Sequence, residues 1–173
     1  MKRTPQTQMA DKVTNVVFAG LGGQGVLKAS DILADAAFEA GLDVKKAEVH
    51  GMSQRGGSVT SDVRFGPRVW SPMVTPGEAD FEVVMEATQT EAARPYLAPG
   101  GRLLSVESVD AAKLPTVKAL NVAMLGLLSA HLPFAEPVWR DAIRANFPAK
   151  LHDANFQAFE AGRAAGRKEM SHV

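Results

Sequence analysis

A length of 173 residues suits a single domain, because two halves of this chain would each have a poor hydrophobic core. The 19 basic and 19 acidic residues cancel. This balance argues against nucleic acid or an anionic membrane as the main partner, since both attract an excess of positive charge.

The sequence contains no cysteine, which excludes disulfides, a Cys nucleophile and thiolate ligands for an iron–sulfur cluster. Residues 1–12 are polar and lack the apolar centre of a signal peptide, so we expect a flexible N-terminal leader. No apolar run reaches the length of about 18 residues that indicates a membrane-spanning helix. These features predict a cytoplasmic protein with no membrane partner, whose residues 13–173 form one domain.

Strands and helices are expected to alternate along this domain. Short β-branched runs bounded by glycine or proline indicate strands, and apolar residues three and four positions apart indicate helices. In chain order the expected elements are a strand at 15–19, a helix at 26–40, strands at 43–50 and 58–65, a segment at 68–73 that pairs back as a hairpin, a strand at 81–87, a helix at 88–96, a strand at 102–106, and helices at 121–131, 137–146 and 155–167. The alternation predicts the α/β class: a single doubly wound, mainly parallel, Rossmann-like sheet with helices on both faces.

A glycine-rich segment, GLGGQG at 20–25, ends the first expected strand and opens the first helix. Glycines let a ligand approach the backbone closely, and a helix N-terminus offers unpaired N–H groups and the positive end of a dipole. Three interpretations remain open: a tight turn that binds nothing, a dinucleotide site, and a site for another phosphate or nucleotide. In the dinucleotide interpretation Glu48, roughly 20 residues further on, would bind the ribose.

A second polar segment, EVHGMSQRGGSV at 48–59, follows the second expected strand. This position predicts a loop beside the glycine turn, at the carboxyl edge of the sheet where doubly wound folds bind ligands. Arg55 can donate two hydrogen bonds to phosphate oxygens, and the neighbouring glycines can add backbone N–H groups. The alternative is a surface loop in which Arg55 pairs with a carboxylate of a partner. We expect His50 to be hydrogen-bonded within the fold rather than to contact a substrate.

The two segments together make the sequence similar to the gamma subunit of 2-oxoacid:ferredoxin oxidoreductases. The resemblance is strongest to the small subunit of indolepyruvate oxidoreductase and to the gamma subunit of its phenylglyoxylate-oxidising relatives, and it runs from about Asn15 to Gly162. Further matches are Ser71-Pro72, Gly77-Glu78-Ala79-Asp80, Pro99-Gly100-Gly101 and the segment from Asn121 to Gly126.

The resemblance implies a gamma subunit in a hetero-oligomeric enzyme that oxidatively decarboxylates an aryl 2-oxoacid to its acyl-CoA. Thiamine diphosphate, Mg²⁺ and iron–sulfur clusters would belong to the partners, which are thiamine diphosphate-binding alpha and beta subunits and a ferredoxin-like iron–sulfur subunit. This chain has neither cysteine nor the Gly-Asp-Gly thiamine diphosphate signature, so it is expected to bind none of these alone. The 2-oxoacid, and ferredoxin or NAD as electron acceptor, stay open.

By position in the family, the glycine turn would face the substrate channel and the second loop would contact the phosphates of coenzyme A (CoA), with Arg55 as the main charge. The implied CoA-contacting residues are Gly22, Gly23, Gln24, Gly25, Ser53, Gln54, Arg55 and Asn121. Some relatives carry lysines where this chain has Gln54 and Arg55, which is a departure from the family pattern.

No general base, nucleophile or set of metal ligands is assigned, because the acidic residues and histidines show no suitable spacing. Two rival functions belong to other classes. One is a stand-alone NAD-binding Rossmann oxidoreductase that uses Glu48, and the other is a structural scaffold that contacts no ligand.

Overall fold

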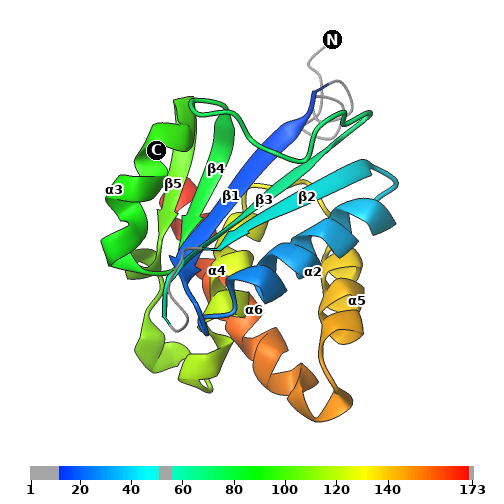
Figure 1. Cartoon of the computed structure of the whole chain (residues 1–173). Coiled ribbons are helices and arrows are strands. Elements are labelled where there is room, and N and C mark those ends of the chain that lie inside the picture. Colours follow the sequence, from blue (N-terminus) through cyan, green and yellow to red (C-terminus); the bar gives the residue numbers. More distant parts are fainter. Residues whose placement is uncertain (1–11, 51–55, 172–173) are drawn as a thin grey trace.

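The computed structural model describes residues 12–50 and 56–171, which form one five-stranded sheet with the order β2-β3-β1-β4-β5 (Figure 1). The strands in chain order are β1 (Thr14–Leu21), β2 (Asp43–His50), β3 (Ser58–Gly66), β4 (Ala79–Val84) and β5 (Leu97–Ser105). Of the leader expected at 1–12, Lys12 alone lies in this described part.

Strand β1 lies at the centre of the sheet. It pairs in parallel with β4, which pairs in parallel with β5, whereas β3 is antiparallel to both β1 and β2. Four of the five strands therefore point the same way, and β3 is reversed. The cause is the short connection at 51–57, since a parallel crossover needs roughly a dozen residues or more. The expected α/β class is confirmed, and the sheet is mainly parallel by strand direction.

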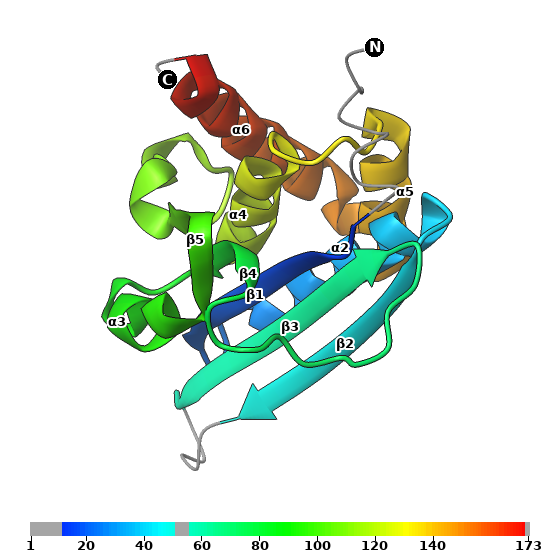
Figure 2. The ribbon, with the colours of Figure 1, turned by 90° about the horizontal axis from the view of Figure 1, so that it is seen from above.

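One face of the sheet carries a thick helical layer, shown from above in Figure 2. Its helices are α2 (Val26–Glu39), α4 (Leu120–Ser129), α5 (Glu136–Asn146) and α6 (His152–Ser171). The main core forms between this layer and inward-facing residues such as Val16, Phe18 and Val83. Trp139 of α5 is fully buried, and its ring centroid lies 5.6 Å from that of Phe159.

The opposite face is covered by thinner structure. Ala93 of the short helix α3 (Thr90–Ala93) packs on Ala19 and Val84, while Val74 of the segment at 67–78 packs on Val17. The expectation of helices on both faces is confirmed, although α3 is a single turn.

Two carboxylates are buried on this second face. Val17 pairs with Asp62 of β3 on one side and with Glu82 of β4 on the other, so all three share one row across the sheet. The backbone N–H of Val74 donates to Asp62 at 2.8 Å. Glu82 is fully buried, and neither carboxylate oxygen has a hydrogen-bond partner among the described residues. Burial raises the pKa of Glu82 to about 7, against the opposing influence of the positive charge on Arg94.

Helices α4 and α6 cross with their backbones in contact. A Cβ atom on Gly162 would overlap the carbonyl oxygen of Ala123, and one on Gly126 would overlap that of Phe159. The close approach of the two helices requires glycine at these positions. Because α6 packs so closely on α4, the apolar residues of α4 are buried inside this chain.

Two expected elements are wrong in detail. The segment 68–73 is not a strand, because side chains of the sheet hold its backbone instead: Arg64 donates to the carbonyls of Ser71 and Met73, and Asp43 accepts from the N–H of Val69. The helix expected at 88–96 is divided into 3-10 turns at 87–89 and 94–96 around α3, with Pro95 in the second turn. The terminal helix is longer than expected, beginning at His152 and ending at Ser171.

Candidate functional site

The glycine turn joins β1 to α2 at the carboxyl edge of the sheet. Gly25 is the N-cap of α2 with φ of 78°, and Gly23 has φ of 90°, a region that only glycine adopts readily. No side chain of the described residues caps α2, and the first turn of this helix contains no acidic residue. The first N–H groups of a helix have no intrahelical partner, so this end can donate hydrogen bonds to an anion or a carbonyl oxygen.

The described end of the second loop, Gly56 and Gly57, lies against the glycine turn. The N–H of Gly22 donates to the carbonyl of Gly57 at 2.9 Å, and a Cβ atom on Gly22 would lie 3.5 Å from the nitrogen of Gly56. Pairing of β1 with β3 continues to Leu21 and Ser58, which fixes this approach. The sequence-based expectation that the two loops are neighbours is therefore confirmed for the described end of the second loop.

Two of the residues expected to contact CoA use their side chains to fix the turn. The side chain of Gln24 accepts from the N–H of Leu21 at 2.8 Å and donates to Glu86 at 3.0 Å. The amide of Asn121, at the start of α4, donates to the carbonyl of Gly25 at 3.2 Å and is nearly buried. These bonds join the turn to the ends of β4 and α4, so both residues position its backbone.

A small cavity of about 340 Å³ lies at the turn. Its lining is mostly glycine and apolar side chains: Leu21, Gly22, Gly23, Gly25, Val26, Leu27, His50 and Val59. His50 is exposed and lies 3.8 Å from Glu48. This lining suits an uncharged chain with a few hydrogen-bonding groups, held by backbone donors at its edge.

The remaining expected contacts, Ser53, Gln54 and Arg55, lie outside the described residues. Gly56, which follows them directly, has φ of 66°. Their role in binding phosphate stays a prediction from the sequence.

Glu48 does not lie where a dinucleotide site requires an acid. In that type of site the second strand is adjacent to the first, whereas here β3 separates β2 from β1. The ammonium of Lys46 lies 2.6 Å from Glu48 and also pairs with Asp31 of α2. Its hydrogen bond lowers the pKa of Glu48, and the two carboxylates raise the pKa of Lys46 although burial opposes this rise. Glu48 is thus part of a local ion-pair cluster.

Sequence reasoning missed Glu86, the acid that orients Gln24. The available signal was an acidic residue directly after the apolar run of β4, at the same carboxyl edge as the glycine turn. Among the described residues, no group of three or more histidine, aspartate or glutamate side chains is arranged to hold a metal ion. No helix in the described part of the chain is long and apolar enough to cross a membrane.

Comparison with known proteins agrees with this geometry. Residues 15–120 match the family described as pyruvate ferredoxin/flavodoxin oxidoreductase. The indolepyruvate oxidoreductase subunit IorB of Thermococcus kodakarensis is 35% identical over 199 aligned positions, which cover 92% of this chain and 98% of that protein.

Solved structures show the same fold. The gamma subunit of a keto/oxoacid ferredoxin oxidoreductase from Geobacter sulfurreducens superposes with a TM-score of 0.69 at 20% identity, covering 90% of this chain and 99% of that one. The 2-oxoglutarate:ferredoxin oxidoreductase of Magnetococcus marinus, solved with 2-oxoglutarate, coenzyme A and succinyl-CoA bound, gives a TM-score of 0.76 at 19% identity. That match covers 91% of this chain but 31% of the longer polypeptide.

Proposed function

Since this chain belongs to the pyruvate ferredoxin/flavodoxin oxidoreductase family, as a gamma-type small subunit, we propose that it forms the CoA side of the active-site cleft in a multi-subunit 2-oxoacid oxidoreductase. The proposed reaction is the oxidative decarboxylation of an aryl 2-oxoacid, such as indolepyruvate or phenylglyoxylate, to its acyl-CoA. The likeness to indolepyruvate oxidoreductase subunits supports this substrate class.

The observation that carries the proposal is the hydrogen bond from Gly22 to Gly57, which brings the end of the second loop against the uncapped N-terminus of α2. Backbone N–H groups and apolar side chains then share one small cavity. We infer that this cavity receives the uncharged arm of CoA and that Ser53, Gln54 and Arg55 bind its phosphates. A guanidinium that donates two hydrogen bonds is well suited to a phosphate.

The other groups that the family uses do not fit this chain. An iron–sulfur cluster needs thiolate ligands, and the sequence has no cysteine. We therefore assign thiamine diphosphate, Mg²⁺ and the clusters to partners, which are thiamine diphosphate-binding alpha and beta subunits and a ferredoxin-like subunit. The proposed complex is cytoplasmic.

The stand-alone NAD-binding function lacks its ribose contact, because Glu48 lies on a strand that is not adjacent to β1. No observation in the described residues favours it over the subunit role.

The test measures CoA dependence in the purified complex. Replacing Arg55 by alanine should raise the KM for CoA about tenfold or more, because one charge-assisted contact to a phosphate is lost. The matched control is Arg94→Ala. Arg94 is exposed, pairs with Glu91 and does not belong to the proposed CoA site. An unchanged KM in Arg55→Ala contradicts the phosphate role, and turnover of NAD by the chain alone contradicts the subunit role.

A further inference from the structure

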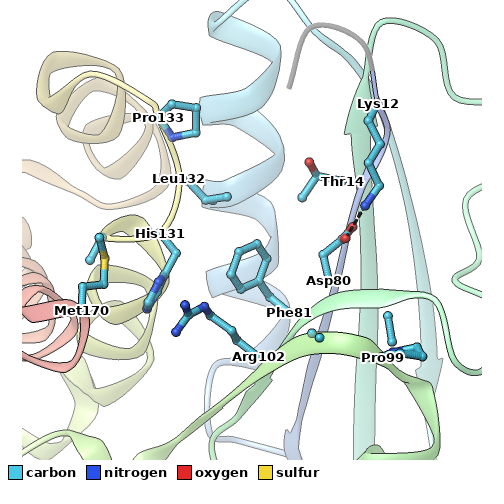
Figure 3. Close-up of a pocket in the computed structure, with 14 residues that line it drawn as sticks. Lys12, Thr14, Asp80, Phe81, Pro99, Arg102, His131, Leu132, Pro133 and Met170 are labelled. Atoms are coloured by element: carbon cyan, nitrogen blue, oxygen red, sulfur yellow. Dashed lines mark hydrogen bonds and ion pairs between the residues drawn. The ribbon is translucent and has the colours of Figure 1, made fainter. Parts of the chain in front are cut away.

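Figure 3 shows a second and larger cavity, of about 960 Å³. It lies at the opposite edge of the sheet from the glycine turn, because the turn follows the last residue of β1 and the cavity is lined by its first. One wall consists of the first residues of β1, β4 and β5, including Thr14, Phe81 and the segment 98–102. The other wall consists of residues 130–133, which follow α4, and Met170 of α6. None of these residues belongs to the proposed CoA site.

Two nitrogen-bearing side chains in this cavity have no hydrogen-bond partner among the described residues. Arg102 is exposed and forms no hydrogen bond or ion pair with the other described residues. The Nε2 atom of His131 is buried and has no hydrogen-bond partner in the described part of the chain. In Figure 3 the two side chains extend from opposite walls toward each other. The buried Nε2 of His131 is costly to leave unpaired, whereas the exposed guanidinium of Arg102 is hydrated and can exchange that water for an anion.

Among the described charged residues that line the cavity, one cation has no ion-pair partner. Lys12 and Asp80 neutralise each other, with Nζ and Oδ1 2.7 Å apart. Burial lowers the pKa of His131, the positive charge of Arg102 lowers it further, and Glu169 acts in the opposite direction. Arg102 is therefore the cation that remains available to an incoming anion.

Apolar groups lie beside these donors. The ring centroids of Phe81 and His131 are 5.9 Å apart, and Leu132, Pro133 and Met170 complete the same region. Ligand sites in proteins commonly have a volume of about 300–1,000 Å³ and combine apolar walls with a few convergent polar groups. The lining selects for a molecule with both an apolar body and an anionic end.

We propose that this cavity is a binding site for a small organic acid that carries one carboxylate on an aromatic or other apolar body. The carboxylate binds Arg102 and accepts a hydrogen bond from His131, and the apolar body lies against Phe81 and Met170. The site goes beyond the proposed function and does not depend on it, since it shares no residue with the CoA loops.

The test titrates phenylacetate into the full chain while the histidine ring signals are followed by NMR. We expect a saturable shift of the His131 signals and a rise in its pKa, because the bound carboxylate offsets the charge of Arg102. The signals of His50 and His152, which lie outside the cavity, should not move. Acetate lacks the apolar body and benzyl alcohol lacks the charge. Each should therefore bind with an affinity at least about tenfold lower than that of phenylacetate.

The variant Arg102→Gln should weaken phenylacetate binding about tenfold or more. Arg94→Gln, at an exposed arginine outside the cavity, should bind as the unaltered chain does, and both variants are surface substitutions expected to fold. The proposal is overturned by the absence of a saturable change at His131, by equal affinity in Arg102→Gln and the unaltered chain, or by acetate binding as tightly as phenylacetate.

Discussion

The buried Glu82 makes a strong prediction about stability and pH. Its pKa rises from an ordinary value of 4.5 to about 7 because burial disfavours the charged form, and at about 1.36 kcal/mol per unit this rise corresponds to about 3 kcal/mol. Below pH 4.5 the carboxyl is protonated in both the folded and unfolded chains, so it does not disfavour folding through its charge. Between pH 4.5 and about 7 the unfolded chain loses its proton first, and the free energy of unfolding falls.

The variant Glu82→Gln removes this titration while keeping the shape of the side chain. Urea unfolding at pH 5 and pH 8 should show that the unaltered chain loses up to about 3 kcal/mol more than the variant over this interval. Exposed Glu39 provides the control, because Glu39→Gln should leave the pH dependence unchanged. Asp62 is also buried with a raised pKa, but it is present in every variant, so the difference between variants reports Glu82. Equal losses of stability in the unaltered chain and in Glu82→Gln would refute the reasoning.

Further predictions concern the glycines. Gly162→Ala should lower the free energy of unfolding by about 2 kcal/mol or more, because the new methyl group overlaps the carbonyl of Ala123 and forces α4 and α6 apart. Thermal unfolding measures this effect. An unchanged melting temperature would contradict the prediction. Gly23→Ala and Gly25→Ala both place a Cβ atom at positive φ and should each cost about 1–2 kcal/mol. Gly25→Ala should cost more than Gly23→Ala because it also overlaps Asn121, and adding Asn121→Ala should recover part of that excess in a double-mutant cycle.

The sequence was most informative where a local pattern determines local structure. The strand at 15–19, the turn at 20–25 and the helix at 26–40 were all predicted to within a few residues, because a buried β-branched run, positive-φ glycines and helical spacing agree there. The meeting of the two loops also followed from the sequence, since strands of an α/β sheet bring successive loops to one edge.

The features that sequence reasoning missed depend on contacts between distant segments. The segment 68–73 was expected to pair back as a hairpin, but Asp43 and Arg64 of other strands hold its backbone by hydrogen bonds. Gln24 was predicted to contact CoA, and nothing near it in sequence shows that its amide also reaches Glu86, 62 residues away. The periodicity of apolar residues predicts which residues are buried, but it does not predict which polar groups form hydrogen bonds with each other.

The geometry of the glycine turn supports the proposal that partner subunits supply the reacting groups. The side chains of Gln24 and Asn121 are occupied in holding the turn, so backbone N–H groups and apolar atoms remain to face a ligand. Among the described residues, His50 is the one titratable side chain that lines the cavity, and it is exposed beside Glu48. A surface of this kind can bind and orient a molecule by shape and hydrogen bonds, but it supplies neither an electron carrier nor a buried acid and base. In the proposed function, the groups that carry out decarboxylation and electron transfer are therefore expected to come from other polypeptides.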